Sequence, residues 1–594
     1  MKRLISLSLT LLMACSITVG GAFVPEAETA FAASDKKEDS AIKVDSEKKK
    51  DSKEHKITSE EFPAYFEADE SAKDMTLYFL DGVKDLPYLE INDLIPLLNE
   101  VYHNTVDYDI SKKDDVVTVS RDNKLYDTDV PLIIDFKKDV MEFADYNLFC
   151  MRADMNTMLD LTSIEVLNDS GEFELLEKIG TGVLDRRGDK FKIKLGDYSI
   201  DLIHQGDQYF IPLQTVADFL VAPTWLETLY FNGECVIKTD DMAHSPHKDR
   251  YYSAPTGKRS KELAEYGYNE LCLMLDTLYG LKEDHKITSF NKLFEEVGFK
   301  EALKDTDPEI ADKAVYRLIT EYIDDVHSNW YDFSYLTGEI DYGAEGKSRA
   351  RVVAARKRYM DARDKAYPDG IPGYEEVGNT AYITFDAFTP QGSIDSYYDA
   401  KSAEDLPDDT ISLIMKAHEQ ITREDSPIEN VVIDLSCNGG GDATAAEFTI
   451  AWFLEEGSIG MEDAMTGAQC VSSYRCDANR DKKFDEKDTL QGKKLFCLTS
   501  PCSFSSGNLV PCMYKESNVV TLLGRPSAGG ACVIQPISTA WGTSFRISSP
   551  RRLSYMKNGS FYDIDRGAAP DYVLTSEESF YDRESLTEYI NSLP

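Results

Sequence analysis

The stretch VVIDLSCNGGGD, residues 431–442, places an apolar run directly before an asparagine, three glycines and an aspartate. A short apolar run without polar alternation is typical of a strand buried on both faces, as in a parallel sheet. The glycines let the backbone adopt positive φ angles and approach a ligand closely. If a helix follows, its free N–H groups suit an anion or a developing oxyanion. An ordinary turn between a strand and a helix is the competing interpretation.

A second stretch with the same pattern is TSPCSFSSGN, residues 499–508, which follows the apolar run KLFCL. It is rich in serine and has no charged residue. A serine at a helix N-terminus can be held exposed on a sharp turn, where the positive end of the helix stabilises an alkoxide or an oxyanion. Serines also cap helices without any role in catalysis. The stretch alone therefore supports either a nucleophile or a set of helix caps.

Strands and helices alternate around these two stretches, from residue 378 onward. Such alternation predicts an α/β domain with a mostly parallel sheet between layers of helices. The predicted strands are 430–436, 494–500 and 518–524, and the predicted helices are 444–457 and 505–517.

The chain before this domain changes character twice. Apolar residues recur every three to four positions over 260–280, 287–298 and 308–325, which predicts helices. Earlier, short β-rich runs separated by turn residues alternate with the amphipathic runs LEINDLIPLLNEVY and FIPLQTVADFL. We therefore expect a β-rich α+β accessory module at 57–243, a helical cap at 258–345 and an α/β domain at 346–594. The accessory module resembles the N-terminal modules of copper amine oxidases, without a His cluster that would form a copper site.

The charge of the chain excludes one class of partner. Its 594 residues, enough for three or four domains, contain 64 Lys and Arg against 106 Asp and Glu, a net charge of −42. A nucleic acid would be repelled over much of such a surface, so we expect no nucleic-acid partner.

The N-terminus is predicted to be a signal peptide over residues 1–32. Lys2 and Arg3 precede an apolar run that is too short to span a bilayer, and AFA, ending at Ala32, fits a small-x-small cleavage site. LMAC, ending at Cys15, resembles a lipoprotein cleavage box and leaves a lipid anchor as the alternative. Residues 33–56 are charged and almost free of apolar residues, which predicts a disordered linker. No later segment is long and apolar enough to span a membrane.

The order of the motifs YITF, VVIDLSCNGGG, TSPCSFSSGN, GRPSAGG and RGAAPD resembles peptidase family S41, the carboxy-terminal-processing and tricorn-core serine peptidases. The resemblance covers roughly residues 258–594 and implies a crotonase- or ClpP-like layered α/β catalytic domain. The family nucleophile is the central serine of a Ser-x-Ser stretch, which implies Ser505. The sequence departs from the family pattern at two positions near Ser505. Asn508 replaces the usual glutamate, and Pro511 is expected to disturb the following helix.

The resemblance also directs the choice of the general base. The processing branch uses a lysine, but the matching position is Gly530, and no lysine lies between Lys515 and Lys557. The branch that includes the tricorn core uses a histidine from the end of the helical region, often in Asp-x-His-Ser. Here DDVHS supplies His327, so the Ser-His mechanism is favoured. No PDZ domain fits between His327 and residue 382.

The remaining members of the site are implied less directly. A histidine base needs an orienting group, and the candidates are Asp325, Asp563 and Asp565. Backbone N–H groups are expected to hold the oxyanion, and the predicted donors are Gly439, Gly440 and Ser506.

A separate stretch, DANRDKKFDEKD at 477–488, resembles an EF-hand-type calcium loop, although Lys482 replaces the turn glycine. A charged solvated loop is the competing interpretation. The cysteines show no CxxC spacing and no zinc pattern, and their pairing cannot be read from the sequence. The predicted ligands of a structural calcium ion are Asp477, Asn479, Asp481, Asp485 and Asp488.

The sequence therefore predicts an exported bacterial serine endopeptidase, secreted or attached to the cell envelope, that acts on a protein or peptide and requires no cofactor. A catalytically inactive binding protein on the same scaffold is the main alternative, because the family lysine and glutamate are missing. A crotonase-like acyl enzyme shares the layered topology but explains TSPCSFSSGN less well.

Overall fold

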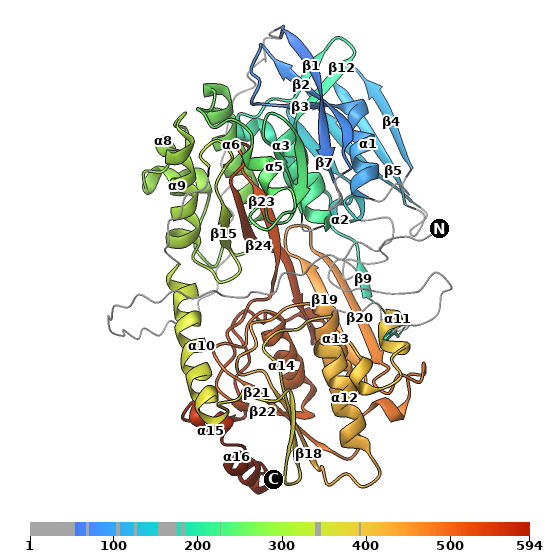
Figure 1. The fold of residues 1–594 in the computed structure, drawn as a ribbon. Coiled ribbons are helices and arrows are strands. Elements are labelled where there is room, and N and C mark those ends of the chain that lie inside the picture. Colours follow the sequence, from blue (N-terminus) through green and yellow to red (C-terminus); the bar gives the residue numbers. More distant parts are fainter. Residues whose placement is uncertain are drawn as a thin grey trace.

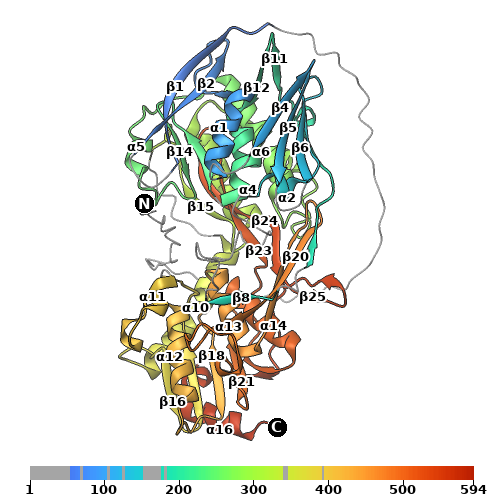
Figure 2. The same cartoon turned by 90° about the vertical axis from the view of Figure 1, so that its right-hand side faces the viewer.

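The computed structural model describes residues 54–66, 71–102, 107–123, 128–151, 175–179, 184–225, 227–338, 346–390 and 394–594. The predicted signal peptide lies outside the described residues, as does the predicted linker up to residue 53. Figures 1 and 2 show an upper lobe that contains the early strands and a lower lobe that contains the C-terminal helix, with strand β24 running from one into the other.

The lower lobe is built on a six-stranded sheet in the order β16-β17-β18-β21-β22-β27, in which only β16 is antiparallel to its neighbour. Its four central strands are almost wholly buried, as the apolar runs predict, whereas the edge strands are partly exposed. Val431 and Val432, adjacent on β18, pack into separate apolar cores on opposite sides of the sheet. The strands are β16 (Tyr374–Val377), β17 (Thr380–Thr384), β18 (Asn430–Asp434), β21 (Lys494–Thr499), β22 (Val520–Gly524) and β27 (Tyr572–Val573).

Helices cover both faces of this sheet, which confirms the α/β prediction. The side chain of Asp442 accepts from the Ala445 N–H and caps α13 at the end of the glycine run. Helix α14 continues through Pro511, so the prediction that this proline would disturb the helix is wrong. Proline removes one N–H donor, but the packing of the buried helix keeps its helical conformation. The helices are α10 (Lys347–Ala366), α11 (Ile394–Tyr398), α12 (Thr410–Thr422), α13 (Ala443–Leu454), α14 (Ser506–Ser517), α15 (Glu578–Tyr581) and α16 (Arg583–Ser592).

The accessory module in the upper lobe contains two sheets, ordered β11-β12-β3-β2-β1-β14-β13 and β10-β7-β6-β5-β4. Their strands are β1 (Ile57–Tyr65), β2 (Lys73–Leu80), β3 (Tyr88–Glu90), β4 (Tyr108–Lys113), β5 (Val116–Asn123), β6 (Thr128–Asp135), β7 (Val140–Phe143), β10 (Phe191–Lys194), β11 (Ile203–Gln205), β12 (Gln208–Pro212), β13 (Thr228–Phe231) and β14 (Val236–Thr239). The two amphipathic runs form α1 (Ile91–Val101), α3 (Leu213–Val216) and η3 (Ala217–Val221). The remaining helices of this part are α2 (Tyr146–Phe149) and α4 (Ala222–Trp225).

The helical cap packs beside this module (Figure 1). Its helices are α6 (Lys261–Leu278), α7 (Phe290–Glu296), α8 (Lys300–Leu303) and α9 (Pro308–Arg317), which continues as the π-helical turn η4 (Leu318–Ile323). A short helix, α5 (Lys248–Tyr252), precedes the cap. Asp324, at φ +40°, ends this turn in the left-handed region, and the chain then passes through His327 into β15 (Asn329–Asp332).

A third sheet joins the lobes, in the order β15-β24-β19-β20-β8, with β23 paired to β24 and β9 to β20. Its strands are β15, β19 (Gly457–Asp463), β20 (Ala468–Cys476), β23 (Cys532–Ser538), β24 (Ser544–Ser554), β8 (Leu176–Lys178) and β9 (Leu184–Arg186). The last two come from within residues 57–243, so the predicted module also contributes strands to the sheet of the α/β domain. Conversely, Trp541 and Phe545 at the tip of the β23–β24 hairpin belong to the core of the upper lobe.

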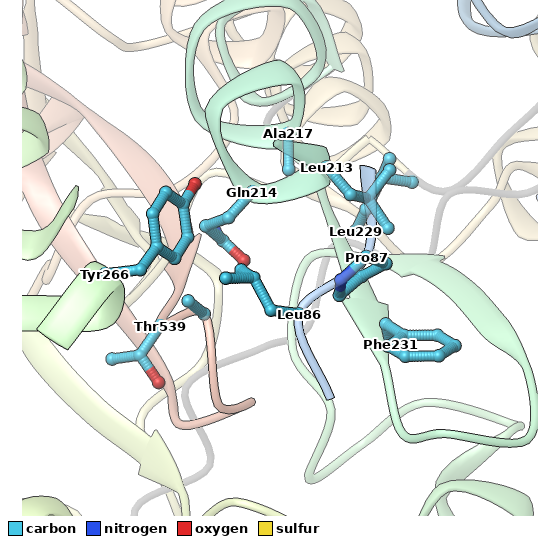
Figure 3. A pocket seen from close by; sticks show the side chains of 10 residues that line it. Leu86, Pro87, Leu213, Gln214, Ala217, Leu229, Phe231, Tyr266 and Thr539 are labelled. Atoms are coloured by element: carbon cyan, nitrogen blue, oxygen red, sulfur yellow. The ribbon is translucent and has the colours of Figure 1, made fainter. Parts of the chain in front are cut away.

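The hairpin tip meets the accessory module at a small cavity of about 20 Å³. Figure 3 shows its lining, with Gln214 directed between the two parts. Gln214 Nε2 donates to Asp218 Oδ1 (2.9 Å) and to the Ser538 carbonyl of β23 (2.8 Å). The bond from Gln214 to Ser538 connects the two parts, as do the bonds from Ser538 Oγ to the Leu229 carbonyl and between the Tyr230 and Ser544 hydroxyls.

The ten cysteines in the described residues are all buried. Their burial agrees with a role as small apolar side chains. Among the described helices, none has the length and hydropathy needed to cross a membrane.

Candidate active site

The two stretches identified in the sequence lie side by side because β18 and β21 are adjacent parallel strands. Parallel strands end at the same edge of a sheet, so the turns that follow them meet. We call residues 436–441 the glycine turn and residues 500–505 the serine turn. The Phe504 N–H donates to the Asn438 carbonyl (3.2 Å), which joins the two turns directly.

Serine hydroxyl groups form hydrogen bonds that connect the serine turn to the residues at the end of β18 and to the glycine turn. Ser500 Oγ donates to the Ser436 carbonyl (2.5 Å) and Ser503 Oγ to the Leu435 carbonyl (2.7 Å). One residue beyond the turn, Ser506 Oγ donates to the Gly441 carbonyl (2.8 Å). Ser505 Oγ alone of these has no hydrogen bond to any described residue. The crowding of serines is therefore structural for three of them, and the fourth keeps a free hydroxyl.

Ser505 also has a strained backbone. It lies at φ +57° and ψ −126°, directly before α14. A residue other than glycine in this region costs on the order of 1–3 kcal/mol and persists only where the surroundings impose it. Its N–H donates to the Gly529 carbonyl (3.0 Å), and a Cβ atom placed on Gly440 would lie 3.2 Å from its Oγ. Strain, a free hydroxyl and a helix N-terminus coincide at this residue.

The GRPSAGG segment wraps around the serine turn and leaves no room for a lysine. Gly530 has φ +93°, and a Cβ atom there would lie 2.6 Å from the Phe504 ring and 3.0 Å from the Ser505 nitrogen. Lys515 forms an ion pair with Asp571. The position matching the lysine base therefore cannot carry a side chain while Phe504 keeps its place.

Asn508, the departure from the usual glutamate, anchors the neighbouring loop. Its Nδ2 donates to the Ile564 carbonyl (3.0 Å), and its Oδ1 accepts from Ser527 Oγ (2.7 Å). Ser527 Oγ in turn accepts from the Ala568 N–H (2.8 Å). The amide thus connects α14 to the segment that carries Asp563 and Asp565.

His327 reaches the serine turn from the cap. Its ring packs against Phe504, with ring centroids 4.5 Å apart, and its carbonyl accepts from Arg546 Nε (2.7 Å). Burial lowers the pKa of His327 to about 4, the charge of Arg546 adds to this shift, and Asp325 opposes it. The imidazole is therefore neutral at pH 7. Its ring nitrogens make no hydrogen bond to Ser505 or to any carboxylate among the described residues.

The three candidate carboxylates are bound elsewhere. Asp325 accepts from the Ser328 N–H (2.7 Å), from the Ser328 and Ser548 hydroxyls (2.6 and 2.9 Å) and from the Tyr279 hydroxyl (2.9 Å). Asp565 Oδ1 accepts from the N–H groups of Gly530 (3.1 Å) and Ala531 (2.6 Å), and burial raises its pKa. Asp563 Oδ1 accepts from the Asp565 N–H (2.9 Å). Asp565 therefore holds the GRPSAGG segment against the serine turn.

The predicted oxyanion donors differ in their availability. The Gly439 N–H donates to the Asp386 carbonyl (3.1 Å), and the Gly440 N–H to Asn438 Oδ1 (2.9 Å). By contrast, the N–H groups of Gly441 and Ser506 have no acceptor in the part of the chain that the structure describes. Gly441 was not among the donors predicted from the sequence, although the run of three glycines pointed to it.

Residues 379–574 match the family model described as Peptidase family S41. These residues form an S41 peptidase domain. A search of curated protein sequences gave no match.

Solved structures resemble the chain at low identity. A lipoprotein from Streptococcus agalactiae aligns at 14% identity over 56% of this chain and 97% of that chain, with a TM-score of 0.34. Mature CPAF aligns at 9% identity over 56% and 96%, with a TM-score of 0.35. The tricorn protease aligns at 11% identity over 82% and 47%, with a TM-score of 0.29.

The S41 domain also carries the loop predicted to bind calcium. In the loop, Asp477 accepts from the N–H groups of Asp481 and Lys482, and Asp488 accepts from those of Asn479 and Asp485. Over the described ranges there is no group of three or more His, Cys, Asp or Glu side chains placed to hold a metal ion.

Proposed function

We propose that the chain is an exported serine endopeptidase in which Ser505 is the nucleophile and His327 the general base. The family match supports a serine peptidase in general. The observation that carries the proposal is the free hydroxyl of Ser505 at a strained helix N-terminus, one residue from the ring that packs on His327.

The chemistry follows from these two side chains. Ser505 Oγ attacks the carbonyl carbon of a peptide bond and transfers its proton to the neutral imidazole of His327. The C–N bond then breaks as His327 returns the proton to the leaving amine. Water hydrolyses the acyl-enzyme by the same route, and Ser505 regains its proton. A base that is neutral at pH 7 is ready for the first step without prior deprotonation.

The oxyanion would form at the start of α14. The N–H of Ser506 is the first of the helix, and the N–H of Gly441 lies in the turn that Ser506 Oγ contacts. Free N–H groups at a helix N-terminus stabilise developing negative charge. Gly439 and Gly440 would take part only after giving up their present acceptors.

The mechanism requires a hydrogen bond between His327 and Ser505 that is not made in this structure. Catalytic hydrogen bonds are often long or absent without substrate and tighten in the complex. The His327 ring contacts Phe504, the residue next to Ser505, so a change in the His327 rotamer on substrate binding could bring the imidazole to the Ser505 hydroxyl.

A fluorophosphonate probe tests the proposal. We expect covalent labelling at Ser505 in the wild type, located by mass spectrometry of the labelled peptide, and none in Ser505→Ala. His327→Ala should reduce the labelling rate at least a hundredfold. Folded wild-type protein that resists the probe would contradict the proposal.

The second candidate is a binding protein without catalytic activity on the same scaffold. It is favoured by the missing bond between Ser505 and His327 and by the acceptors already held by Gly439 and Gly440. Absence of labelling in folded protein, with retained binding of peptides, is its expected signature.

Export and calcium binding belong to the same proposal. Sequencing the N-terminus of the mature protein distinguishes cleavage after Ala32 from a lipid anchor at Cys15. Calorimetric titration with calcium tests the loop at 477–488, where the Asp477 carboxylate accepts from the N–H groups of Asp481 and Lys482.

A further inference from the structure

Helix α10 is a strongly basic element in an acidic protein. It carries eight basic and two acidic side chains, whereas the whole chain has a net charge of −42. Figure 1 shows it running along one side of the lower lobe toward α15. One of its side chains, Arg356, points at the glycine turn. A Cβ atom placed on Gly439 would lie 3.7 Å from Arg356 Nη1 and within 4 Å of no other described residue beyond its chain neighbours.

The charge of Arg356 is only partly neutralised. The Asp386 carbonyl accepts from the Gly439 N–H. The Asp386 carboxylate accepts from Nη1 and Nη2 of Arg363, at 2.7 and 2.9 Å. Arg356 Nη2 lies 3.8 Å from the same carboxylate, beyond hydrogen-bond distance. Asp386 therefore lies beside two arginines but is hydrogen-bonded only to Arg363, so the positive charge of Arg356 has no close counter-charge in this carboxylate. The Arg356 side chain is 31% exposed, so its guanidinium can be reached.

A second pair of arginines repeats this arrangement. Arg358 and Arg525 share Glu577, at 3.4 and 3.1 Å. In the serine turn, burial and the charge of Asp386 raise the pKa of the Cys502 thiol, whereas a hydrogen bond with Ser500 and the charges of Arg356 and Arg358 oppose that shift. On the side of the site that faces α10, four arginines therefore lie beside only two carboxylates, Asp386 and Glu577.

We propose that Arg356 binds a carboxylate of the peptide substrate beside the scissile bond, so that the site prefers acidic peptides. This inference rests on the proposed function. Guanidinium groups bind carboxylates through charge-assisted hydrogen bonds. Gly439 provides the space, because it is exposed and has no side chain between the turn and Arg356. The bound carboxylate would hydrogen-bond to the Arg356 guanidinium, which Asp386 does not reach at hydrogen-bond distance.

Binding to the Ser505→Ala protein tests the preference without any need for turnover. The probes are fluorescent, capped decapeptides in which one Glu is moved through a neutral sequence, each paired with the Gln peptide. We expect at least one Glu position to bind about tenfold tighter than its Gln partner. In Arg356→Gln this ratio should fall to about one. In Arg356→Lys, which keeps the charge, part of it should remain.

Lys357→Gln is the matched control, because it removes the same charge from the next residue, whose exposed side chain pairs with Asp361 (3.0 Å). It should leave the ratio unchanged. An uncapped Gln peptide distinguishes a C-terminal carboxylate from an acidic side chain; tighter binding of that peptide alone, lost in Arg356→Gln, assigns the site to chain ends. The proposal is overturned if no carboxylate improves binding, or if Arg356→Gln keeps the ratio. Failure of wild-type probe labelling would instead refute the proposed function and leave this binding result standing.

Discussion

The ring of His327 packs against the ring of Phe504, with centroids 4.5 Å apart, and Phe504 immediately precedes the strained Ser505. The same aromatic ring thus buries the candidate base and adjoins the candidate nucleophile. Replacing it should alter the titration of His327. In Phe504→Ala we expect the pKa of His327 to rise from about 4 toward 6.5, because water reaches the imidazole and the cost of burying its charge falls. NMR titration of the His327 ring protons measures the shift, and an unchanged pKa would show that Phe504 does not cause the burial.

The pH dependence of peptide cleavage should report the same group. Only the neutral imidazole can accept the Ser505 proton, so kcat/KM should rise with pH through about 4 and reach a plateau by about pH 6. In Phe504→Ala the midpoint should move upward together with the NMR value. A wild-type midpoint near 6.5 would contradict a buried His327 as the base.

Gly530 is expected to tolerate no side chain. In Gly530→Ala the added Cβ atom meets the Phe504 ring at 2.6 Å, so probe labelling of Ser505 should be lost or reduced at least a hundredfold. Gly492→Ala is the control, because Gly492 also has a positive φ, +76°, but an added Cβ atom would meet nothing within 4 Å. The control should cost about 1–2 kcal/mol of stability through backbone strain alone and leave labelling unchanged. Equal labelling in both variants would show that the contact with Phe504 is unimportant.

Asp565 is expected to act by positioning the GRPSAGG segment. In Asp565→Asn the side-chain carbonyl can still accept from the N–H groups of Gly530 and Ala531, so labelling should stay within about threefold of the wild type. Asp565→Ala leaves both N–H groups without this acceptor, which typically costs about 1–3 kcal/mol for each buried group. If Asp565→Asn instead abolishes labelling while the protein remains folded, the negative charge itself is needed, as in a catalytic triad.

The buried contact between α3 and α6, where Thr215 donates to Glu270, should make the stability depend on pH. Burial raises the pKa of Glu270 to about 7 from an ordinary 4.5, and its partner Asp218 is also shifted upward by burial and by the charge of Glu270. Between these values the unfolded chain has released a proton that the folded protein retains. The free energy of unfolding should therefore fall as pH rises from about 4.5 to 7.

Chemical denaturation at several pH values measures this slope, which Glu270→Gln should flatten. The variant keeps an oxygen that can accept from Thr215 Oγ1, as Glu270 does at 3.0 Å. An exposed substitution on the same helix, Glu262→Gln, serves as the control and should keep the slope. Stability that rises with pH over this range in the wild type would refute the assignment.

Local sequence pattern was sufficient for the elements that carry the site. The apolar runs at 430–436 and 494–500 form β18 and β21, and the predicted helix at 505–517 forms α14. Adjacent parallel strands then bring the glycine turn and the serine turn together without further information. The cap helices could also be predicted from the sequence, because their apolar residues recur with helical spacing.

Other properties of the site depend on contacts between distant residues. Which serine keeps a free hydroxyl is decided by the carbonyls of Leu435, Ser436 and Gly441, and no pattern within TSPCSFSSGN reveals them. The loss of Gly439 and Gly440 as free donors likewise depends on Asp386 and Asn438.

The pairing of strands that are far apart in the chain could not be predicted from the sequence either. Strands β8 and β9 are three residues each and pair with β20, which lies almost three hundred positions later in the chain. Runs so short carry too little periodicity to specify a partner.

The hairpin of β23 and β24 has a consequence for any attempt to divide the protein. Its tip supplies Trp541 and Phe545 to the upper core, while the other end of β24 pairs with β19 in the lower lobe. Cutting the chain at the boundary before residue 346 would leave an apolar cleft in one fragment and an unsupported aromatic hairpin in the other. We therefore expect the two lobes to unfold cooperatively, and recombination of the S41 domain with a foreign cap would have to preserve this shared hairpin.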